Sequence, residues 1–238
     1  MLLKDFDSLP EEFKNEDVHT IYKKLKKRTA SLVLKRIFDV AVSVVILLIL
    51  LLPMAAIAIA IKADSKGEVL FCQKRVTTFG REFVIYKFRT MVQNAESLGA
   101  QVTTDGDVRI TKVGRFLRKY RLDEFPQLIN ILKGDMSFVG TRPEVPKYVK
   151  AYTPEMYATL LLPAGITSLA SIRYKDEERL ISESDDADYT YTKEILPQKM
   201  KYNLKYLDNF SFFGDIKLMF MTFLAVITPE VQETGVEI

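Results

Sequence analysis

The chain has 238 residues, a formal net charge of +3, 1 His and 1 Cys. This length predicts one domain, or one domain with a small appendage. The lone Cys72 excludes an internal disulfide and is typical of a reducing compartment. A single His and a single Cys exclude a tetrahedral zinc site, and the polar surroundings of His19 argue against a buried His-dependent triad. Any metal is therefore expected to have oxygen ligands, which indicates Mg²⁺.

The first 36 residues divide into an acidic part and a basic part. Residues 1–22 hold six acids and two lysines and are expected to form a solvated tail or a loose surface helix. Residues 23–36 are basic and adjoin a membrane segment, so anionic headgroups are a better partner for them than nucleic acid. We predict no nucleic-acid binding and assign residues 1–31 to a leader.

An apolar run occupies residues 40–61, where only Ser43 and Pro53 among 22 positions fall outside the hydrophobic set. As a helix it would measure ~33 Å, enough to cross the hydrocarbon core. Pro53 divides it into 13 and 8 residues, and proline kinks or breaks a helix interior. Seven Lys or Arg residues lie on each flank, and such flanks prefer the cytoplasm. Two interpretations stay open: a single-pass anchor, and a re-entrant helix that breaks at Pro53.

The region after the apolar run predicts a small hairpin followed by helices. Residues 69–76 and 82–88 have an alternating pattern that includes β-branched and aromatic side chains. They flank a Thr-Thr-Phe-Gly turn, which is typical of a hairpin. Residues 91–99 and 144–161 have a helical pattern. Residues 175–193 are acidic and are expected to form a surface loop or helix.

Two more helices are predicted farther along. Apolar residues at i, i+3, i+4 and i+7 predict an amphipathic helix from about Asp123 to Lys133, with Pro126 in its first turn and Gly134 at its end. The last apolar stretch, residues 210–227, contains charged residues and is predicted to be an interfacial or packed helix, not a second span.

Adjacent carboxylates, Asp123 and Glu124, carry the chemical prediction. One interpretation is structural: Asp123 caps the helix and Glu124 complements its dipole. The other is functional, because six basic residues in 108–122 precede the pair and can bind phosphate. Cations and Mg²⁺ would keep two neighbouring acids ionised. An ionised carboxylate can attack phosphorus.

Six short sequence motifs follow one another along the chain. They are Lys35-Arg36-Ile37-Phe38-Asp39, Gln73-Lys74-Arg75, Tyr86-Lys87-Phe88-Arg89-Thr90-Met91, residues 107–118, Leu122-Asp123-Glu124-Phe125-Pro126-Gln127-Leu128, and residues 133–143. With these strings the chain, over about residues 32–228, resembles the bacterial sugar transferase family. These are the monotopic polyprenyl-phosphate phosphoglycosyl transferases, of which this would be a small form.

The resemblance implies a function and a fold. The family transfers a sugar 1-phosphate from a nucleoside diphosphate sugar, usually a UDP-sugar, to undecaprenyl phosphate and releases UMP, initiating surface polysaccharide or lipopolysaccharide assembly. The implied fold is α+β and mainly helical, with a membrane re-entrant helix (residues 32–63) broken at Pro53, a small β-hairpin and amphipathic interfacial helices. Residues 64–238 would be a catalytic domain on the cytoplasmic face of the bacterial inner membrane. A homodimer is left open.

The resemblance also assigns roles to residues. Asp123 would be the nucleophile that forms a covalent phosphosugar, and Glu124 would help to hold Mg²⁺ or assist the acceptor. The residues implied in substrate or phosphate binding are Arg118, Arg142, Lys87, Arg89, Gln73 and Arg75. Phosphoryl transfer depends on charge stabilisation and positioning, so a scarcity of histidine is no handicap.

Three departures from the family pattern stand out. Leu52 precedes Pro53 where the family has serine, which removes a side-chain oxygen near the break. Thr141 replaces the first proline of a Gly-Pro-Arg-Pro loop and is expected to loosen it. Residues 163–169 lack the family's tryptophan, which favours a different sugar. The sequence does not identify that sugar or the glycan pathway.

Two alternatives remain. The chain could be a non-catalytic membrane-anchored scaffold in which Asp123 only caps a helix. A single-pass glycosyltransferase is less favoured, because neither Asp-x-Asp sequence, Asp105-Gly106-Asp107 nor Asp5-Phe6-Asp7, follows a nucleotide-binding α/β pattern.

Overall fold

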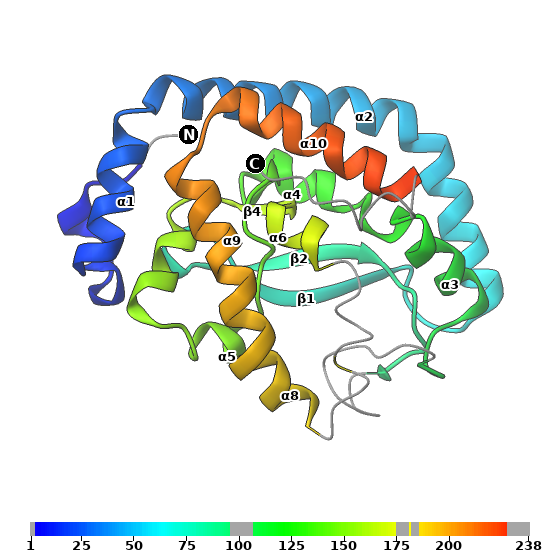
Figure 1. Cartoon of the computed structure of the whole chain (residues 1–238). Coiled ribbons are helices and arrows are strands. Elements are labelled where there is room, and N and C mark those ends of the chain that lie inside the picture. Colours follow the sequence, from blue (N-terminus) through cyan, green and yellow to red (C-terminus); the bar gives the residue numbers. More distant parts are fainter. Residues whose placement is uncertain (1–2, 96–106, 175–180, 182–185, 228–238) are drawn as a thin grey trace.

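The computed structural model describes residues 3–95, 107–174, 181 and 186–227. The described chain is mainly helical and contains a small β-hairpin, as predicted, together with a second small sheet (Figure 1). Its α-helices and strands are α1 Glu16–Lys26, α2 Thr29–Asp64, β1 Leu70–Val76, β2 Glu82–Phe88, α3 Lys112–Lys119, α4 Gln127–Lys133, β3 Met136–Val139, α5 Pro146–Val149, β4 Ala164–Thr167, α6 Leu169–Arg173, α8 Ala187–Thr190, α9 Leu196–Asp208 and α10 Phe212–Ile227. Short 3-10 turns span Phe6–Ser8, Glu11–Phe13, Thr78–Gly80, Leu122–Glu124 and Pro154–Leu160, and a π-helical turn spans Tyr191–Ile195.

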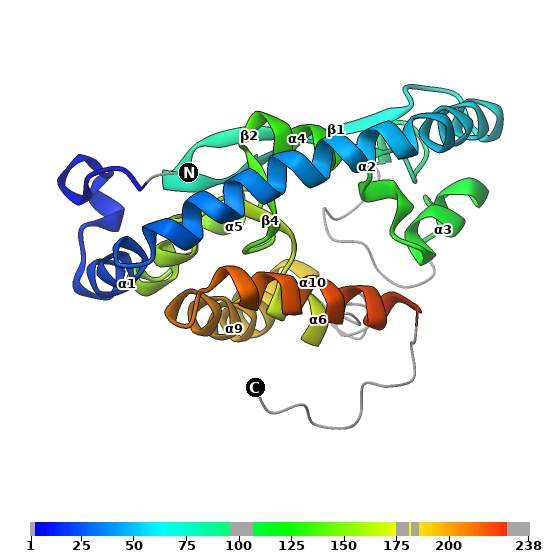
Figure 2. The ribbon, with the colours of Figure 1, turned by 90° about the horizontal axis from the view of Figure 1, so that it is seen from above.

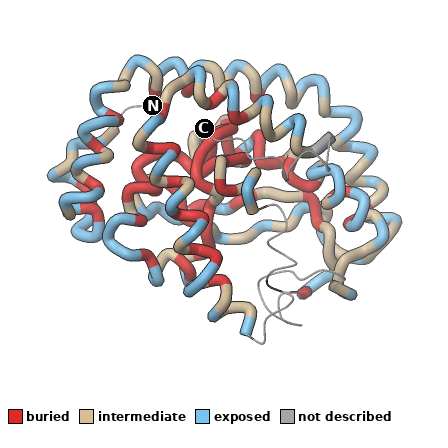
Figure 3. The backbone as a smooth tube through the Cα atoms, in the orientation of Figure 1, coloured by how far each residue is buried: buried red, intermediate tan, exposed pale blue. Residues whose placement is uncertain are grey.

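Helix α2 contains the apolar run and extends beyond it in both directions. It runs along one edge of the molecule and bends downward in its cyan, C-terminal part (Figure 1). The segment stays helical through Pro53, so the proline lies inside one helix of 36 residues and does not end it. Among the described residues this helix alone is long and apolar enough to cross a membrane, and only 6% of its most apolar window is buried. Its outward surface is largely exposed (Figure 3).

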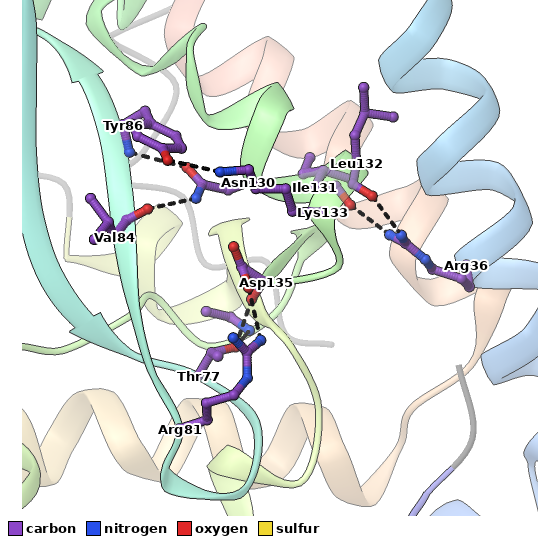
Figure 4. Close-up of polar contacts among 11 residues, drawn as sticks. Arg36, Thr77, Arg81, Val84, Tyr86, Asn130, Ile131, Leu132, Lys133 and Asp135 are labelled. Atoms are coloured by element: carbon purple, nitrogen blue, oxygen red, sulfur yellow. Dashed lines mark hydrogen bonds and ion pairs between the residues drawn. The ribbon is translucent and has the colours of Figure 1, made fainter.

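The N-terminal half of α2 is fixed to the domain by two cations. Lys35 is buried and donates to the Asp215 carboxylate of α10 at 2.5 Å and to the Val139 carbonyl at 2.8 Å. Arg36 donates to the carbonyls of Ile131 and Leu132 at 2.6 and 3.0 Å (Figure 4). These carbonyls lie in the last turn of α4, where carbonyls have no amide four residues on within the helix, so Arg36 helps to complete its end; the Ile131 carbonyl also accepts from the Gly134 amide at 3.0 Å.

The C-terminal end of α2 is fixed to the same domain. The Asp64 carboxylate accepts from the Val113 amide at 2.9 Å, which joins α2 to the start of α3. Arg89, at the end of β2, donates to the Ser65 carbonyl at 2.8 Å and to the Lys66 carbonyl. Both ends of the apolar helix are therefore attached to one folded body.

The predicted hairpin is confirmed in position, and the structure adds its register. Strands β1 and β2 pair antiparallel from Leu70 opposite Phe88 to Val76 opposite Glu82. Alternation places Gln73, Arg75 and Lys87 on one face of the hairpin. Helix α4 closes the free edge of β2, because Asn130 accepts from the Tyr86 amide at 3.1 Å and donates to the Val84 carbonyl at 2.7 Å (Figure 4).

The second sheet was not predicted. Strands β3 and β4 pair in parallel, Met136 with Ala164 and Val139 with Thr167. The loop after β3 is held by the Gly140 amide, which donates to the Thr167 carbonyl at 3.0 Å, and by the Thr141 carbonyl, which accepts from Gly165 at 2.9 Å. Backbone hydrogen bonds thus hold this loop on both sides of Thr141, and the expectation that Thr141 loosens it relative to proline stays a prediction.

Replacing Gly165 with alanine is expected to destabilise the protein by about 1–3 kcal/mol, as overpacking does. A Cβ at this position would lie 2.2–2.6 Å from backbone atoms of Gly140, which cannot move aside cheaply. The matched control is Gly214→Ala in α10, whose Cβ would meet only the movable Ser211 hydroxyl at 2.9 Å. Thermal unfolding of both variants in detergent gives the comparison; equal melting temperatures would contradict the prediction.

The leader is folded, which corrects the expectation of a solvated tail or loose helix. Phe13, Val18 and Leu25 are buried in the main core. Asn15 caps α1 by accepting from the Val18 amide at 3.0 Å, and its amide group donates to the Pro154 carbonyl at 3.1 Å. The acids of this segment face outward while its apolar residues, spaced along short helical turns, face the core.

The remaining helical predictions had mixed outcomes. The helix over 91–99 is wrong for 91–95, where Met91 instead pairs with Ile110 as a β-bridge; residues 96–99 lie outside the described residues. The segment 144–161 forms two short helical pieces.

Much of the acidic segment 175–193 also lies outside the described residues. Helix α10 packs beside α2 (Figures 1 and 2) and leaves Phe213 80% exposed, as expected of a packed interfacial helix.

Candidate active site

Asp123 and Glu124 lie in the short 3-10 turn between α3 and α4. The turn begins after Arg121, which has a left-handed backbone (φ 56°), uncommon for a side chain other than glycine. Helix α4 starts only after Pro126, and no side chain caps it. The interpretation of Asp123 as a helix cap is therefore wrong, since the turn places the carboxylate before the helix and not on its first amides.

Glu124 is the centre of an ion-pair cluster. Its Oε1 accepts from Lys87 Nζ of β2 at 3.1 Å and from an Arg142 guanidinium nitrogen at 3.0 Å. Glu124 is 7% exposed. Burial would raise its pKa, but Arg142 and Lys87 hold the pKa of this carboxyl well below its usual range. Glu124 is therefore ionised, and it joins the hairpin to the loop that carries Arg142.

Asp123 has a different environment from its neighbour. It is 9% exposed, and its Oδ1 is buried with no hydrogen-bond partner. Burial and the adjacent Glu124 charge raise its pKa, while Lys87, Arg121 and Arg118 act in the opposite direction. A buried carboxylate oxygen without a partner is costly, so its presence indicates a site shaped for a ligand.

The hairpin brings further predicted residues to the same cluster. Arg75 shares a strand face with Gln73 and Lys87 and donates to the Pro143 carbonyl at 3.1 Å, while its Nε is buried without a partner. Burial lowers the pKa of Lys87, and the Glu124 charge opposes that fall. The cluster thus concentrates cations around two carboxylates, an arrangement suited to a phosphate group.

Two other predicted residues occupy distinct places. Arg118 lies half-buried on α3, where its charge opposes the rise in the pKa of Asp123. Arg89 is buried, and its guanidinium donates to carbonyls at the end of α2. These carbonyls belong to Ser65 and Lys66, directly after α2, so Arg89 fixes the chain where it leaves that helix; a contact with phosphate stays a prediction.

The comparison with known proteins agrees with this geometry. The profile of the bacterial sugar transferase family matches residues 30–229. The chain belongs to this family. Everything before residue 30, including helix α1, lies outside the match.

Named relatives extend the comparison. The chain is 38% identical over 199 residues to a UDP-N-acetylgalactosamine-undecaprenyl-phosphate N-acetylgalactosaminephosphotransferase of Aeromonas hydrophila, covering 82% of this chain and 44% of the relative. It is 36% identical over 195 residues to an undecaprenyl-phosphate glucose phosphotransferase of Komagataeibacter xylinus, covering 79% and 35%. It is 34% identical over 205 residues to an uncharacterized sugar transferase, EpsL, of Bacillus subtilis, covering 86% and 93%. The chain thus spans less than half the length of the first two relatives.

The described part of this family member offers few metal ligands. In the part of the chain that the structure describes, no group of three or more His, Cys, Asp or Glu side chains could hold a metal ion. The unpartnered oxygen of Asp123 suits Mg²⁺, which commonly takes one or two carboxylates and completes its shell with phosphate and water. Glu124 already accepts from two cations, so its role as a metal ligand stays a prediction.

Three residues of this family member were not predicted as site residues. Arg121 acts on the pKa of both carboxylates. Gln127, in the first turn of α4, and Thr141, beside Arg142, are buried and each has a side-chain polar atom without a partner, Nε2 and Oγ1 respectively. Gln127 and Thr141 each lie in one of the family strings, and Arg121 is one of the six basic residues before Asp123; the backbone angle of Arg121 and the unpartnered atoms of Gln127 and Thr141 need the fold.

Proposed function

We propose that this chain transfers a sugar 1-phosphate from a nucleoside diphosphate sugar, with UDP as the expected nucleotide, to undecaprenyl phosphate. The product would start a surface glycan at the cytoplasmic face of the bacterial membrane. The observation that carries the proposal is the buried Asp123 carboxylate, unpartnered at Oδ1 and placed beside a cation-held Glu124. The names of the relatives support the same substrates.

The reaction would proceed in two displacements. An Asp123 oxygen attacks the β-phosphorus of the donor; a carboxylate O–P bond forms, the pyrophosphate bond breaks, and UMP leaves with the bonding electrons. A phosphate oxygen of the acceptor then attacks the same phosphorus and releases Asp123 as a carboxylate. Each displacement needs an in-line approach and charge neutralisation more than proton transfer.

The residues around Asp123 would divide this work. Arg75, Lys87, Arg118 and Arg142 bring positive charge to a site that must accept two phosphorylated substrates. Glu124 holds Lys87 and Arg142 in place through ion pairs of 3.1 and 3.0 Å. Mg²⁺, when bound at Asp123, would supply further neutralisation of the donor diphosphate.

A panel of UDP-sugars tests the proposal. The purified full chain, with undecaprenyl phosphate and Mg²⁺, is expected to release UMP from at least one of them. Mass spectrometry after donor treatment without acceptor should find a phosphosugar on the peptide that contains Asp123. Transfer without any such adduct would contradict the covalent step but not the overall reaction.

A change in pH dependence follows from the charges around Asp123. Only the ionised carboxylate attacks, so kcat/KM falls as pH falls through the pKa of Asp123, which is raised above its usual value. Arg121→Asn removes a lowering charge yet keeps a residue that tolerates the left-handed backbone. The pH at which kcat/KM of this variant falls on the acidic side should therefore be higher than in the unchanged chain. Lys119→Gln is the control, an exposed cation that is not among the charges found to act on Asp123; equal shifts would contradict the assignment.

We also propose that α2 is re-entrant. Its two ends are attached to one domain, by Lys35 and Arg36 before the apolar run and by Asp64 after it. A helix that crossed the membrane would place its ends on opposite sides. The bend of α2, visible in Figure 1, is consistent with a return to the same face.

Cysteine labelling tests this topology. In a Cys72→Ser background, Lys27→Cys and Lys66→Cys introduce thiols at exposed positions on either side of the run. In inside-out vesicles both should react with an impermeant maleimide, and in spheroplasts neither should. The unchanged chain, which keeps Cys72 exposed on β1, is labelled separately as the control for the side on which the domain lies. Labelling of the two positions from opposite sides would contradict the proposal.

A further inference from the structure

A second buried polar cluster lies behind the candidate active site. Glu144, Tyr191 and Lys199 are 4% exposed each and come from three parts of the chain: the loop after Arg142, the π-helical turn and α9. The Tyr191 hydroxyl donates to Glu144 Oε1 at 2.6 Å. Lys199 Nζ donates to that hydroxyl at 3.2 Å and lies 3.9 Å from Glu144 Oε1. Nothing in the reaction described above uses this cluster.

The cluster adjoins Arg75 through the backbone. The Val76 amide donates to the Glu144 carbonyl at 3.0 Å, and Arg75 itself donates to the Pro143 carbonyl at 3.1 Å. These two hydrogen bonds join the end of β1 to the loop that follows Arg142, at the position of the buried Glu144. These backbone contacts place Glu144 beside the strand residue that follows Arg75, and the Arg142 charge acts on Arg75 from the same loop.

The electrostatics of Arg75 depend on this acid. Burial lowers the pKa of the Arg75 guanidinium, and Arg142 adds to that fall. The Glu144 carboxylate is the largest influence in the opposite direction, ahead of Tyr191 and Tyr148. A buried arginine whose charge no nearby acid offsets would be strongly destabilising.

The turn that carries Tyr191 is itself unusual. A π-helical turn, Tyr191–Ile195, runs directly into α9, which has Pro197 in its first turn. Proline lacks the amide that would continue the helical hydrogen bonds, and a wider turn accommodates this loss. Single π-turns inside helices occur frequently at functional sites. Here the turn presents a tyrosine to Glu144.

We propose that Glu144 is a positioning residue, which holds Arg75 on the phosphate-binding face of the hairpin while Tyr191 and Lys199 fix its carboxylate. The ligand concerned is the diphosphate of the donor, so the inference rests on the proposed function. Because Glu144 offsets the charge of Arg75 when no diphosphate is present, while Glu124 holds Arg142, both arginines can stay oriented between turnovers. The donor then binds to a site that is already organised.

The test is a double-mutant cycle read by calorimetry with inorganic pyrophosphate as the probe. Glu144→Gln keeps the size of the side chain and an acceptor for Tyr191 but removes the charge. It should weaken pyrophosphate binding about tenfold, comparable to the loss of one charge-assisted interaction. Arg75→Gln should weaken it at least as much. The double variant should bind no more weakly than Arg75→Gln alone, because Glu144 acts through Arg75.

The matched control is Glu155→Gln, which makes the same charge change at an exposed position of the 3-10 turn Pro154–Leu160. It should bind pyrophosphate as the unchanged chain does. If Glu144→Gln does not fold, Tyr191→Phe replaces it, and a two- to threefold weakening is expected because the carboxylate remains but is less firmly held.

Three results would overturn the inference. They are unchanged affinity in Glu144→Gln, additive losses in the double variant, and no pyrophosphate binding by the unchanged chain. UMP release from UDP-sugars is measured separately in the same preparations. If pyrophosphate binds with the expected cycle but UMP release is absent, the proposed reaction fails and the positioning role stands.

Discussion

Asp123→Asn is expected to lower UMP release by at least about 10⁴-fold, the scale seen when a catalytic nucleophile is removed. Asparagine keeps the shape of the side chain, but its amide cannot attack phosphorus at a useful rate. The neighbouring Glu124 cannot substitute, because Lys87 and Arg142 already occupy its Oε1. The variant should also form no phosphosugar adduct when it is incubated with the donor alone.

The same substitution separates a catalytic role from a structural one. If Asp123 capped a helix, its loss would cost about 1 kcal/mol. In the structure it caps none, and its Oδ1 is buried without a partner. Asp123→Asn is therefore expected to melt at or slightly above the temperature of the unchanged chain, because a neutral amide is less costly to bury than a carboxylate.

Asp135→Asn is a suitable comparison. Asp135 follows α4, at the opposite end of that helix from the Asp123 turn, and makes an ion pair with Arg81 at 2.8 Å (Figure 4). It should retain most of the activity, since an ion pair with one exposed partner contributes little to stability. UMP release by Asp123→Asn near that of Asp135→Asn would contradict the assignment of the nucleophile.

The local elements of the fold could be predicted from the sequence because their signals are local. Alternating residues around Thr77–Gly80 gave the hairpin to within one residue, and the i, i+3, i+4, i+7 pattern with Gly134 gave the end of α4. The start of that helix was predicted four residues too early. A 3-10 turn and Pro126 precede the helix. The acidic pair Asp123 and Glu124 is compatible both with such a turn and with the first turn of an α-helix.

Features that depend on distant contacts could not be predicted. The pairing of β3 with β4 joins segments separated by more than twenty residues, and neither alternates in polarity because both are almost wholly buried. The leader was misjudged for a related reason: its acids dominate the composition, while a few buried residues, such as Phe13 and Leu25, decide its packing.

The site itself was only partly predictable. The strings that resemble the family named the carboxylates and the cations, and the fold brings Arg75, Lys87 and Arg142 close to them. Composition could not show which of the two acids is ion-paired. Glu124 accepts from two cations, and Asp123 Oδ1 accepts from none. The opposite directions in which their pKa values shift follow from that difference and not from residue type.

Lys35→Met is expected to destabilise the protein by about 3–5 kcal/mol, the cost of leaving a buried partner charge unpaired. Lys35 and Asp215 have side chains that are 6% and 4% exposed, and they join α2 to α10 at 2.5 Å. Asp215 also accepts from the Tyr206 hydroxyl at 2.8 Å, so its carboxylate is fixed from a third helix, α9. Removing the lysine would leave this carboxylate buried beside Asp39, another acid that lowers its tendency to ionise.

For a chain of this length the loss corresponds to a fall in melting temperature on the order of 10 °C. The control is Lys24→Met, which breaks the ion pair between α1 and α9 formed by Lys24 and Asp208, whose side chains are 45% and 42% exposed. That change should cost less than about 1 kcal/mol, because water screens an exposed pair. The double variant Lys35→Met with Asp215→Leu should recover much of the stability, since it removes both charges together. Equal losses for Lys35→Met and Lys24→Met would show that burial does not decide the strength of the attachment, and α10 would then hold α2 through apolar packing alone.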